Sequence, residues 1–268
     1  MVRGRSFLFC LLACPALLMT CAVVPSAAPS AAFDHPAPAA SGPDPAAGKL
    51  LDQAVLLLAP ERVQWLAMTV WQRVQCDDDL CYQAEGRYLA APGQRRSLRL
   101  QVTVGRTRGQ VQAVSDGRRL WQMHRVGEGL PVVTLLDLPA TAGEDELRRR
   151  GLAGVGGLLT AIHGQLRQPR RETILWGGRQ VCRITGEWPT DTAKLASLPD
   201  DVPPTAVPRR CRVYLDAKTL WPCRVEWWGQ EPAGGVDVLL AQIEFRDPVL
   251  NRPLPPERCA REFAVGPG

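Results

Sequence analysis

Residues 97–104, SLRLQVTV, place an apolar side chain at every second position. Such alternation has the period of a β-strand with one buried face. Short segments of the same kind recur before and after it, and turn-forming residues such as Asp116-Gly117 separate them. An Asp-Gly pair between two strand patterns predicts a hairpin. The first half of the chain is therefore predicted to be an antiparallel meander, with strands at 65–75, 81–89, 97–104, 110–114 and 120–125.

Strand-like segments return after residue 171. They are rich in β-branched and aromatic residues and lie at 172–176, 179–187, 211–215, 221–228 and 238–245. The intervening residues 190–209 hold four prolines, which exclude a central strand because proline has no backbone N–H for the ladder. The strand pattern as a whole predicts one large antiparallel sheet.

Two segments have a helical rather than a strand pattern. Residues 49–58, KLLDQAVLLL, carry apolar side chains at helical spacing. A second helix is predicted from Gly143 to about Gln168, since acidic residues begin it and basic residues follow. Its glycines weaken a continuous helix, so two shorter pieces or a mobile flap are the alternatives. Helices together with the sheet predict an α+β domain dominated by one curved antiparallel sheet.

The chain begins with MVRGRS and an apolar run, FLFCLLACPALLMTCAVV, followed by small residues. These are the parts of a secretory signal. Pro15 interrupts the run before it reaches the roughly 20 apolar residues of a transmembrane helix. We expect a signal peptide at 1–28, a disordered Pro/Ala-rich leader at 29–48 and a single domain at 49–268. Lipidation of Cys14, which follows Leu-Leu-Ala, is the alternative to simple cleavage.

The charge balance of the chain argues against a nucleic-acid partner. Arg3 and Arg5 fall within the signal, so 30 basic residues stand against 27 acidic ones in the rest of the chain. Near neutrality with scattered arginines is not the basic patch that nucleic acid requires. We expect an exported monomer of the periplasm or cell envelope, which associates with a membrane only if it is lipidated.

Nine cysteines include three in the signal and six after it. An even number in an exported chain favours disulfides. Cys76 and Cys81 bracket three aspartates and a leucine, CDDDLC, between two predicted strands. We expect this pair to close a hairpin, with the aspartates as solvated turn residues.

The other four cysteines allow three pairings. We expect Cys182 to pair with Cys211 and Cys223 with Cys259, while Cys211 to Cys223 across a hairpin is the main competitor. Their spacing lacks the two close cysteine pairs that are typical of a zinc site. The three aspartates of CDDDLC cannot alone supply the six or more oxygens of a calcium site. We expect neither a metal nor a cofactor.

The sequence offers no catalytic motif. Its histidines, at positions 35, 124 and 163, are widely separated, and neither a Gly-x-Ser-x-Gly elbow, a His-Glu-x-x-His pair nor a phosphate-binding loop is present. We expect a protein that is not an enzyme.

Several segments, in their order along the chain, resemble a known family. Glu85-Gly-Arg-Tyr-Leu-Ala-Ala-Pro92 is followed by Val114-Ser-Asp-Gly-Arg-Arg-Leu-Trp121, then by Val213-Tyr-Leu-Asp-Ala-Lys-Thr-Leu-Trp-Pro222 and a late Phe-Arg-Asp-Pro-Val-Leu-Asn251. Together they resemble the LolA/LolB-like periplasmic lipoprotein carriers over most of residues 49–265. The resemblance implies a half-barrel, which is an incomplete β-barrel with helices packed as a lid on its concave side.

The resemblance also implies a function, the binding of an acyl chain or other amphiphile, or of a lipoprotein, in an apolar cavity. One departure is that Ala91 stands where these carriers often have a basic residue that holds the lid. The alternative function is a structural or interaction protein of the envelope that keeps the fold without a ligand. The bulky side chains expected to line the cavity are Met68, Val70, Trp71, Leu98, Leu100, Val102, Trp121, Met123 and Trp227.

Overall fold

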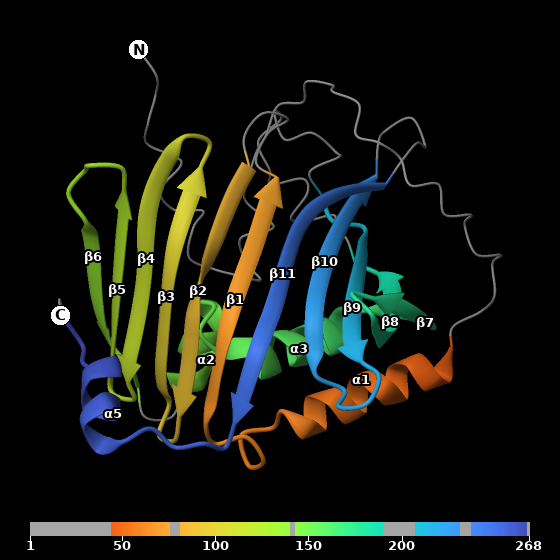
Figure 1. Ribbon diagram of the computed structural model, residues 1–268, viewed down its shortest axis with the longest axis horizontal. Coiled ribbons are helices and arrows are strands. Elements are labelled where there is room, and N and C mark those ends of the chain that lie inside the picture. The colour runs from red at the N-terminus through yellow and green to blue at the C-terminus, as the bar shows by residue number, and fades with distance from the viewer. Residues whose placement is uncertain (1–43, 76–80, 140–142, 190–206, 231–236, 267–268) are drawn as a thin grey trace.

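The computed structural model describes residues 44–75, 81–139, 143–189, 207–230 and 237–266. Its main element is an eleven-stranded sheet in the order β6-β5-β4-β3-β2-β1-β11-β10-β9-β8-β7. All neighbouring strands run antiparallel. The sheet is not closed into a barrel, and helices α1, α2 and α3 lie behind it in Figure 1. The predicted α+β half-barrel with helices on its concave side is confirmed.

The N-terminal strands form the predicted meander, and each strand pairs with the next. They extend the predicted segments by a few residues and add one strand, β6, which the sequence reading did not predict. Its sequence, VVTLLD, does not alternate, and β6 lies at the edge of the sheet, where it is paired only to β5. The strands are β1 (Leu66–Gln75), β2 (Cys81–Ala91), β3 (Arg95–Val104), β4 (Thr107–Asp116), β5 (Arg119–Val126) and β6 (Val132–Asp137).

The C-terminal strands form a second meander that ends in the middle of the sheet. The last strand, β11, pairs with β1, and Val70 stands opposite Phe245. Pairing of the first strand with the last joins the two meanders and leaves β6 and β7 at the edges. These strands are β7 (Arg167–Trp176), β8 (Arg179–Glu187), β9 (Arg210–Asp216), β10 (Pro222–Gln230) and β11 (Asp237–Leu250).

Helix α1 (Pro45–Leu57) begins four residues before the predicted helix. Asp44 is its N-cap, and the carboxylate accepts a hydrogen bond from the backbone N–H of Ala46 at 2.9 Å. Pro45 at the first helical position needs no hydrogen-bond donor there. The expected leader at 29–48 is therefore too long, because its last four residues belong to a helix and Ala47 is fully buried.

The glycine-rich region forms two helices, α2 (Gly143–Arg149) and α3 (Gly154–Gln165), as in the two-piece alternative. The connection between them is tied to the sheet, since the Tyr88 hydroxyl donates a hydrogen bond to the carbonyl of Leu152 at 3.0 Å. A further helix, α5 (Pro256–Glu262), was not predicted. It lies at one end of the molecule, beside the strand ends in Figure 1.

Gly86, in the middle of β2, marks a very close approach between strands. A Cβ atom at this position would lie 1.8 Å from the carbonyl oxygen of Arg99 on β3. Glycine inside a strand commonly permits such an approach or a bend. Only a residue without a side chain therefore fits here, on the face of the sheet that carries Val70 and Leu100.

We predict that Gly86→Ala lowers the free energy of unfolding by about 3 kcal/mol, because the new methyl group would collide with backbone rather than with a movable side chain. The matched control is Gly164→Ala in α3, where no heavy atom lies within 4 Å of the added Cβ. This control should change stability by no more than about 1 kcal/mol, in the stabilising direction. Urea unfolding measures both, and equal effects of the two variants would contradict the close approach.

Two buried tyrosines are expected to make the fold less stable at alkaline pH. Burial raises the pKa of Tyr88 to about 12. Burial also raises the pKa of Tyr214 to about 12, helped by the Glu226 carboxylate, which accepts a hydrogen bond from the Tyr214 hydroxyl at 2.8 Å. Both phenols are neutral in the folded protein at pH values where the unfolded chain has begun to ionise them.

We predict that stability is unaffected by these tyrosines below about pH 10, where both are neutral in the folded and unfolded states. As the pH rises from 10 to 12, each should cost about 1.4 kcal/mol per pH unit, because the unfolded chain loses its protons first. Urea unfolding at about pH 9 and about pH 11 measures the loss, and Tyr214→Phe should reduce it. Ionisation of both tyrosines near pH 10 in a still-folded protein would contradict the prediction.

Candidate functional site

The sheet has two faces, and the strand pairing fixes which side chains share each of them. The inner face is defined here as the face packed against α1 and α3, where Met68, Val70 and Leu100 join buried side chains of the two helices in one hydrophobic cluster. The outer face carries the alternate residues of every strand. Side chains directly opposite each other on neighbouring strands point to the same face.

Two rows of side chains cross the inner face from β1 to β5. They lie at successive inward positions on each strand, and both rows are apolar until they reach β5. The first row is Met68, Tyr88, Leu98, Ala113 and Gln122. The second row is Val70, Gly86, Leu100, Val111 and His124.

Six of the nine residues expected to line the cavity share this inner face. Val102 lies one step beyond Leu100 along β3 and is buried. Trp227 on β10 stands opposite Ala241 of β11, which in turn stands opposite Val74 of β1. The strand register therefore brings together Met68, Val70, Leu98, Leu100, Val102 and Trp227.

The other three expected residues point to the outer face, so the predicted grouping is corrected at Trp71, Trp121 and Met123. Each is adjacent in sequence to an inward-facing residue, and successive side chains of a strand point to opposite faces. The guanidinium of Arg246 lies 5.5 Å from the centre of the Trp71 ring. Hydrophobicity alone could not separate the two faces, because both carry bulky apolar side chains.

The two inner rows end on β5 in polar side chains, and neither was among the residues expected to line the cavity. Gln122 is fully buried and His124 is 6 % exposed. The side-chain nitrogen and oxygen of Gln122 and both ring nitrogens of His124 have no hydrogen-bond partner in the described part of the chain. Burial lowers the pKa of His124, so its imidazole is neutral at pH 7. The alternation of Leu120, Gln122 and His124 on one side of β5 was the signal in the sequence.

The helices over the inner face are held by polar contacts. Arg96 of β3 forms an ion pair with Glu144 of α2, with 3.5 Å between Nη2 and Oε2. His163 of α3 lies 2.7 Å, measured from Nε2, from Oδ1 of Asp52 in α1. Arg96 is thus a basic residue that reaches a helix of the lid, one strand away from the position where the family resemblance would place one.

Ala91, the position where the resembled carriers often have a basic residue, faces the outer side. It is buried in a small cluster with Leu89 and with Phe263, which follows α5. A long basic side chain at this position would have to displace that packing. The departure noted in the sequence therefore agrees with the local structure.

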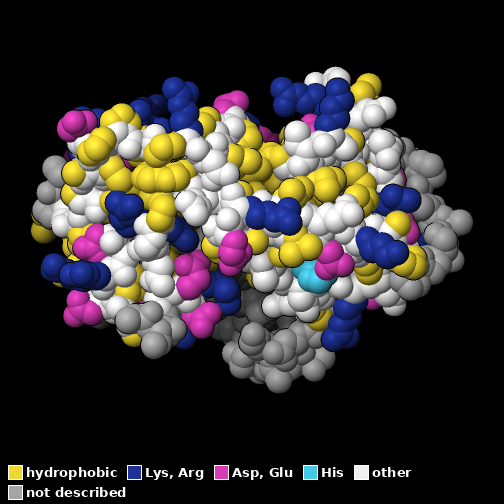
Figure 2. Space-filling model, turned by 90° about the horizontal axis from the view of Figure 1, so that it is seen from below, with side chains coloured by type: hydrophobic (Ala, Val, Ile, Leu, Met, Phe, Trp, Pro, Cys, Tyr) yellow, Lys and Arg dark blue, Asp and Glu magenta, His cyan; other side chains and the backbone are white. Residues whose placement is uncertain are grey.

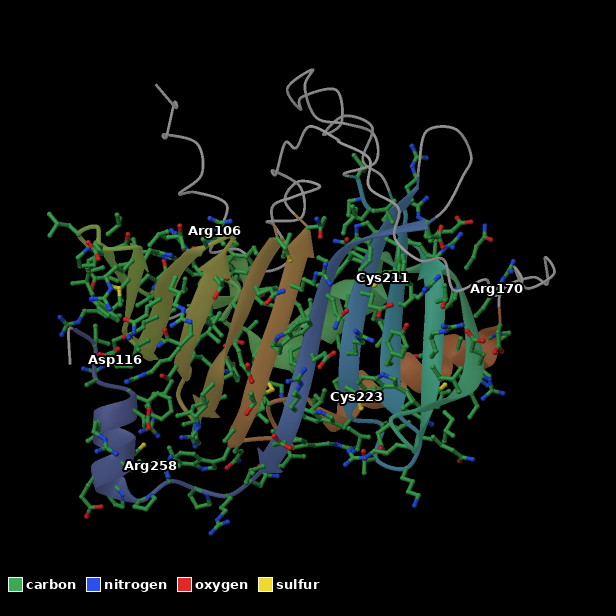
Figure 3. The ribbon with its side chains drawn as sticks, turned by 45° about the horizontal axis from the view of Figure 1, so that its top comes forward. Arg106, Asp116, Arg170, Cys211, Cys223 and Arg258 are labelled. Atoms are coloured by element: carbon green, nitrogen blue, oxygen red, sulfur yellow. The ribbon has the colours of Figure 1, made fainter. Side chains whose placement is uncertain are left out.

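The strand register contradicts the predicted disulfides. Cys182 stands opposite Leu215, whereas Cys211 stands opposite Gly186. Their offset of four residues along the strands corresponds to about 13 Å, and disulfides need Cα atoms within about 7 Å. Cys211 and Cys223 are also far apart along neighbouring strands, as Figure 3 shows. All five described cysteines are free.

Cys223 and Cys259 belong to different parts of the protein. Cys223 packs against the cluster of the inner face. Cys259, in α5, packs against the outer cluster and accepts a hydrogen bond from Nη1 of Arg95 at 3.3 Å. This pairing is therefore wrong as well. The expected pairing of Cys81 with Cys76 lies outside the described residues, since Cys76 is not among them.

The described residues contain no group of three or more His, Cys, Asp or Glu side chains that could hold a metal ion. A search of the same residues for a helix long and apolar enough to cross a membrane found none. The expected signal peptide and Cys14 lie outside the described part of the chain.

Comparisons with known proteins gave structural likenesses only. No family model matches the chain, and no curated protein matches its sequence. A DUF1329 family protein from Desulfovibrio piger is 8 % identical over 80 % of this chain and 96 % of its own, with a TM-score of 0.31. A LolA superfamily protein from Nitrosomonas europaea is 12 % identical over 79 % of this chain and 96 % of its own, with a TM-score of 0.25.

A third similar structure is a putative outer membrane lipoprotein-sorting protein domain from Vibrio parahaemolyticus. It is 9 % identical over 80 % of this chain and 96 % of its own, with a TM-score of 0.29. The function proposed below rests on the geometry of this chain itself.

We predict that non-reducing peptide mapping of the folded protein finds no peptide that joins Cys182 to Cys211, Cys211 to Cys223, or Cys223 to Cys259. The strand register and the two separate clusters keep these sulfur atoms apart. Free thiols should be alkylated in acid before digestion, so that exchange cannot create new pairs. Recovery of any of these three cross-links in stoichiometric yield would contradict the register.

Proposed function

We propose that this protein binds an amphiphile, with the acyl chain of the ligand held on the inner face of the half-barrel. The observation that carries the proposal is the apolar composition of the two inner rows over four consecutive strands. Three strand spacings separate β1 from β4, a width of about 14 Å. Apolar surface of this extent at one side of an open sheet suits an extended hydrocarbon chain.

The helices cover the inner face of the sheet, where most side chains of the two rows are buried. In Figure 1, α1, α2 and α3 lie behind the middle of the sheet and the β7 side. Leu147 of α2 packs with Leu120, at the beginning of β5. The inner rows therefore lead from beneath α1 and α3 toward the β6 edge of the sheet.

Hydrophobic side chains also reach the surface at the end of the molecule seen in Figure 2, interspersed with arginines and acidic residues. On α1, Leu56 and Leu57 are 58 % and 40 % exposed. A surface of mixed apolar and charged side chains can contact an amphiphile without becoming a large apolar patch.

A binding protein rather than an enzyme is the function we propose. The ligand is an acyl chain, either as a free amphiphile or as part of a lipoprotein. The basic and apolar start of the sequence supports export to the periplasm or cell envelope. Binding of an acyl chain on the inner face requires neither a metal nor a cofactor.

The edge strand β6 supports the second candidate, an envelope protein that binds a partner and carries no ligand. Val132, Val133 and Leu135 are each about half exposed on this strand. An exposed apolar edge can accept a further strand from another chain. Capture of one defined partner by a form shown to be free of lipid would favour this candidate.

We predict that Leu98→Gln weakens binding of a hydrophobic fluorescent dye about tenfold, because an apolar contact on the inner face is lost and an amide must be desolvated. Fluorescence titration measures the affinity, and displacement of the dye by a long-chain alkane shows that hydrocarbon occupies the same site. Urea unfolding of the variant confirms that it is folded.

The matched control is Met123→Gln, which places the same amide at a half-buried position on the outer face. This variant should bind the dye as the unchanged protein does. Equal weakening by both substitutions, or no binding by the unchanged protein, would refute the proposed function.

A further inference from the structure

Gln122 and His124 are buried polar side chains with unused hydrogen-bonding capacity. Both point to the inner face of β5, two residues apart, and neither makes a hydrogen bond within the described part of the chain. Polar groups buried in folded proteins nearly always have partners, because an unsatisfied one loses its hydrogen bonds to water without replacement. A neighbouring pair of such groups on one face therefore points to a ligand that supplies the missing bonds.

The strands on either side of Gln122 and His124 offer them few hydrogen-bond partners. Their inward-facing neighbours on β4 are Ala113 and Val111, which offer no polar side-chain atom. The residues opposite them on β6 are Thr134 and Val132, both exposed at the edge strand. The pair thus forms a polar end to two otherwise apolar rows.

The chemistry of the pair defines the class of ligand group. The glutamine amide offers N–H donors and a carbonyl acceptor, and a neutral imidazole offers one N–H donor and one nitrogen acceptor. Since burial keeps His124 neutral at pH 7, the pair presents no charge to balance an ionised headgroup. An uncharged group that both donates and accepts hydrogen bonds, such as an amide or a hydroxyl, matches it.

We propose that Gln122 and His124 bind the uncharged polar group of the amphiphile, and that its hydrocarbon chain extends from β5 across β4 and β3 toward β1. The inference rests on the proposed function and adds the orientation of the ligand and the class of its headgroup. Leu98 and Leu100 contact the hydrocarbon chain, while Gln122 and His124 bind the polar group to which that chain is attached.

The test compares two ligands of equal chain length, a long-chain primary amide and the corresponding alkane, by displacement of the hydrophobic dye. The unchanged protein should prefer the amide by at least tenfold. Gln122→Met, which keeps the shape of the side chain, and His124→Leu should each reduce this preference about fivefold, and the double variant should nearly abolish it. Affinity for the alkane should stay the same or rise.

The matched control is Gln112→Met on β4, which removes a glutamine that points to the outer face opposite Met123. It should leave the preference for the amide unchanged. Urea unfolding of the ligand-free proteins adds a second readout. Gln122→Met should raise the unfolding midpoint, because it removes an unsatisfied buried amide, whereas a purely structural role of Gln122 predicts a lower midpoint.

The outcomes separate this inference from the function on which it rests. If the unchanged protein binds dye and alkane, and the preference for the amide survives in the double variant, the role of the polar pair is refuted while the proposed function stands. If the unchanged protein binds neither dye nor alkane, the proposed function itself fails. Loss of the preference together with a raised midpoint supports the inference.

Discussion

The packing of β2 on β3 depends on a close contact between Gly86 of β2 and the carbonyl oxygen of Arg99 on β3. A side chain at position 86 would have to occupy space that the neighbouring backbone already fills, so the two strands can approach on the inner face only with glycine there. The approach lies in the row that contains Val70 and Leu100, where the helices cover the sheet. The inner surface to which the helices and the proposed ligand would bind therefore includes this close approach of two strands.

The two faces of the sheet differ in the buried polar side chains that they carry. The outer face of β9 to β11 carries a polar network, in which Glu226 accepts hydrogen bonds from Tyr214 and from the indole of Trp228. On the inner face, Gln122 and His124 are buried polar side chains whose polar atoms have no hydrogen-bond partner in the described part of the chain. Satisfied groups stabilise the fold, and unsatisfied buried groups persist at a cost that binding can offset. The neighbouring pair of unsatisfied side chains is the reason to place the ligand on the inner face.

Period-two alternation was sufficient to predict most of the sheet, since ten of its eleven strands follow the alternating or β-branched segments of the sequence. It could not predict β6, which is stabilised by pairing with β5 rather than by a buried face of its own. Only six of the nine residues expected to line the cavity share the inner face, because the sequence alone does not distinguish apolar residues of the two faces. Trp71 and Val70 are neighbours, and only the register shows which of them faces the helices. The pairing of Cys182 with Cys211 failed for a related reason, since spacing along the chain does not reveal their four-residue offset in the register.

The most direct test of the central claim is a mass spectrum of the protein after gentle purification from its own cells, recorded once under native conditions and once after solvent extraction. We expect about one amphiphile per chain, with a long hydrocarbon chain and an uncharged hydrogen-bonding group, released by extraction and displaced by the dye. A protein that is ligand-free under native conditions, and whose inner face binds neither dye nor alkane, would contradict it.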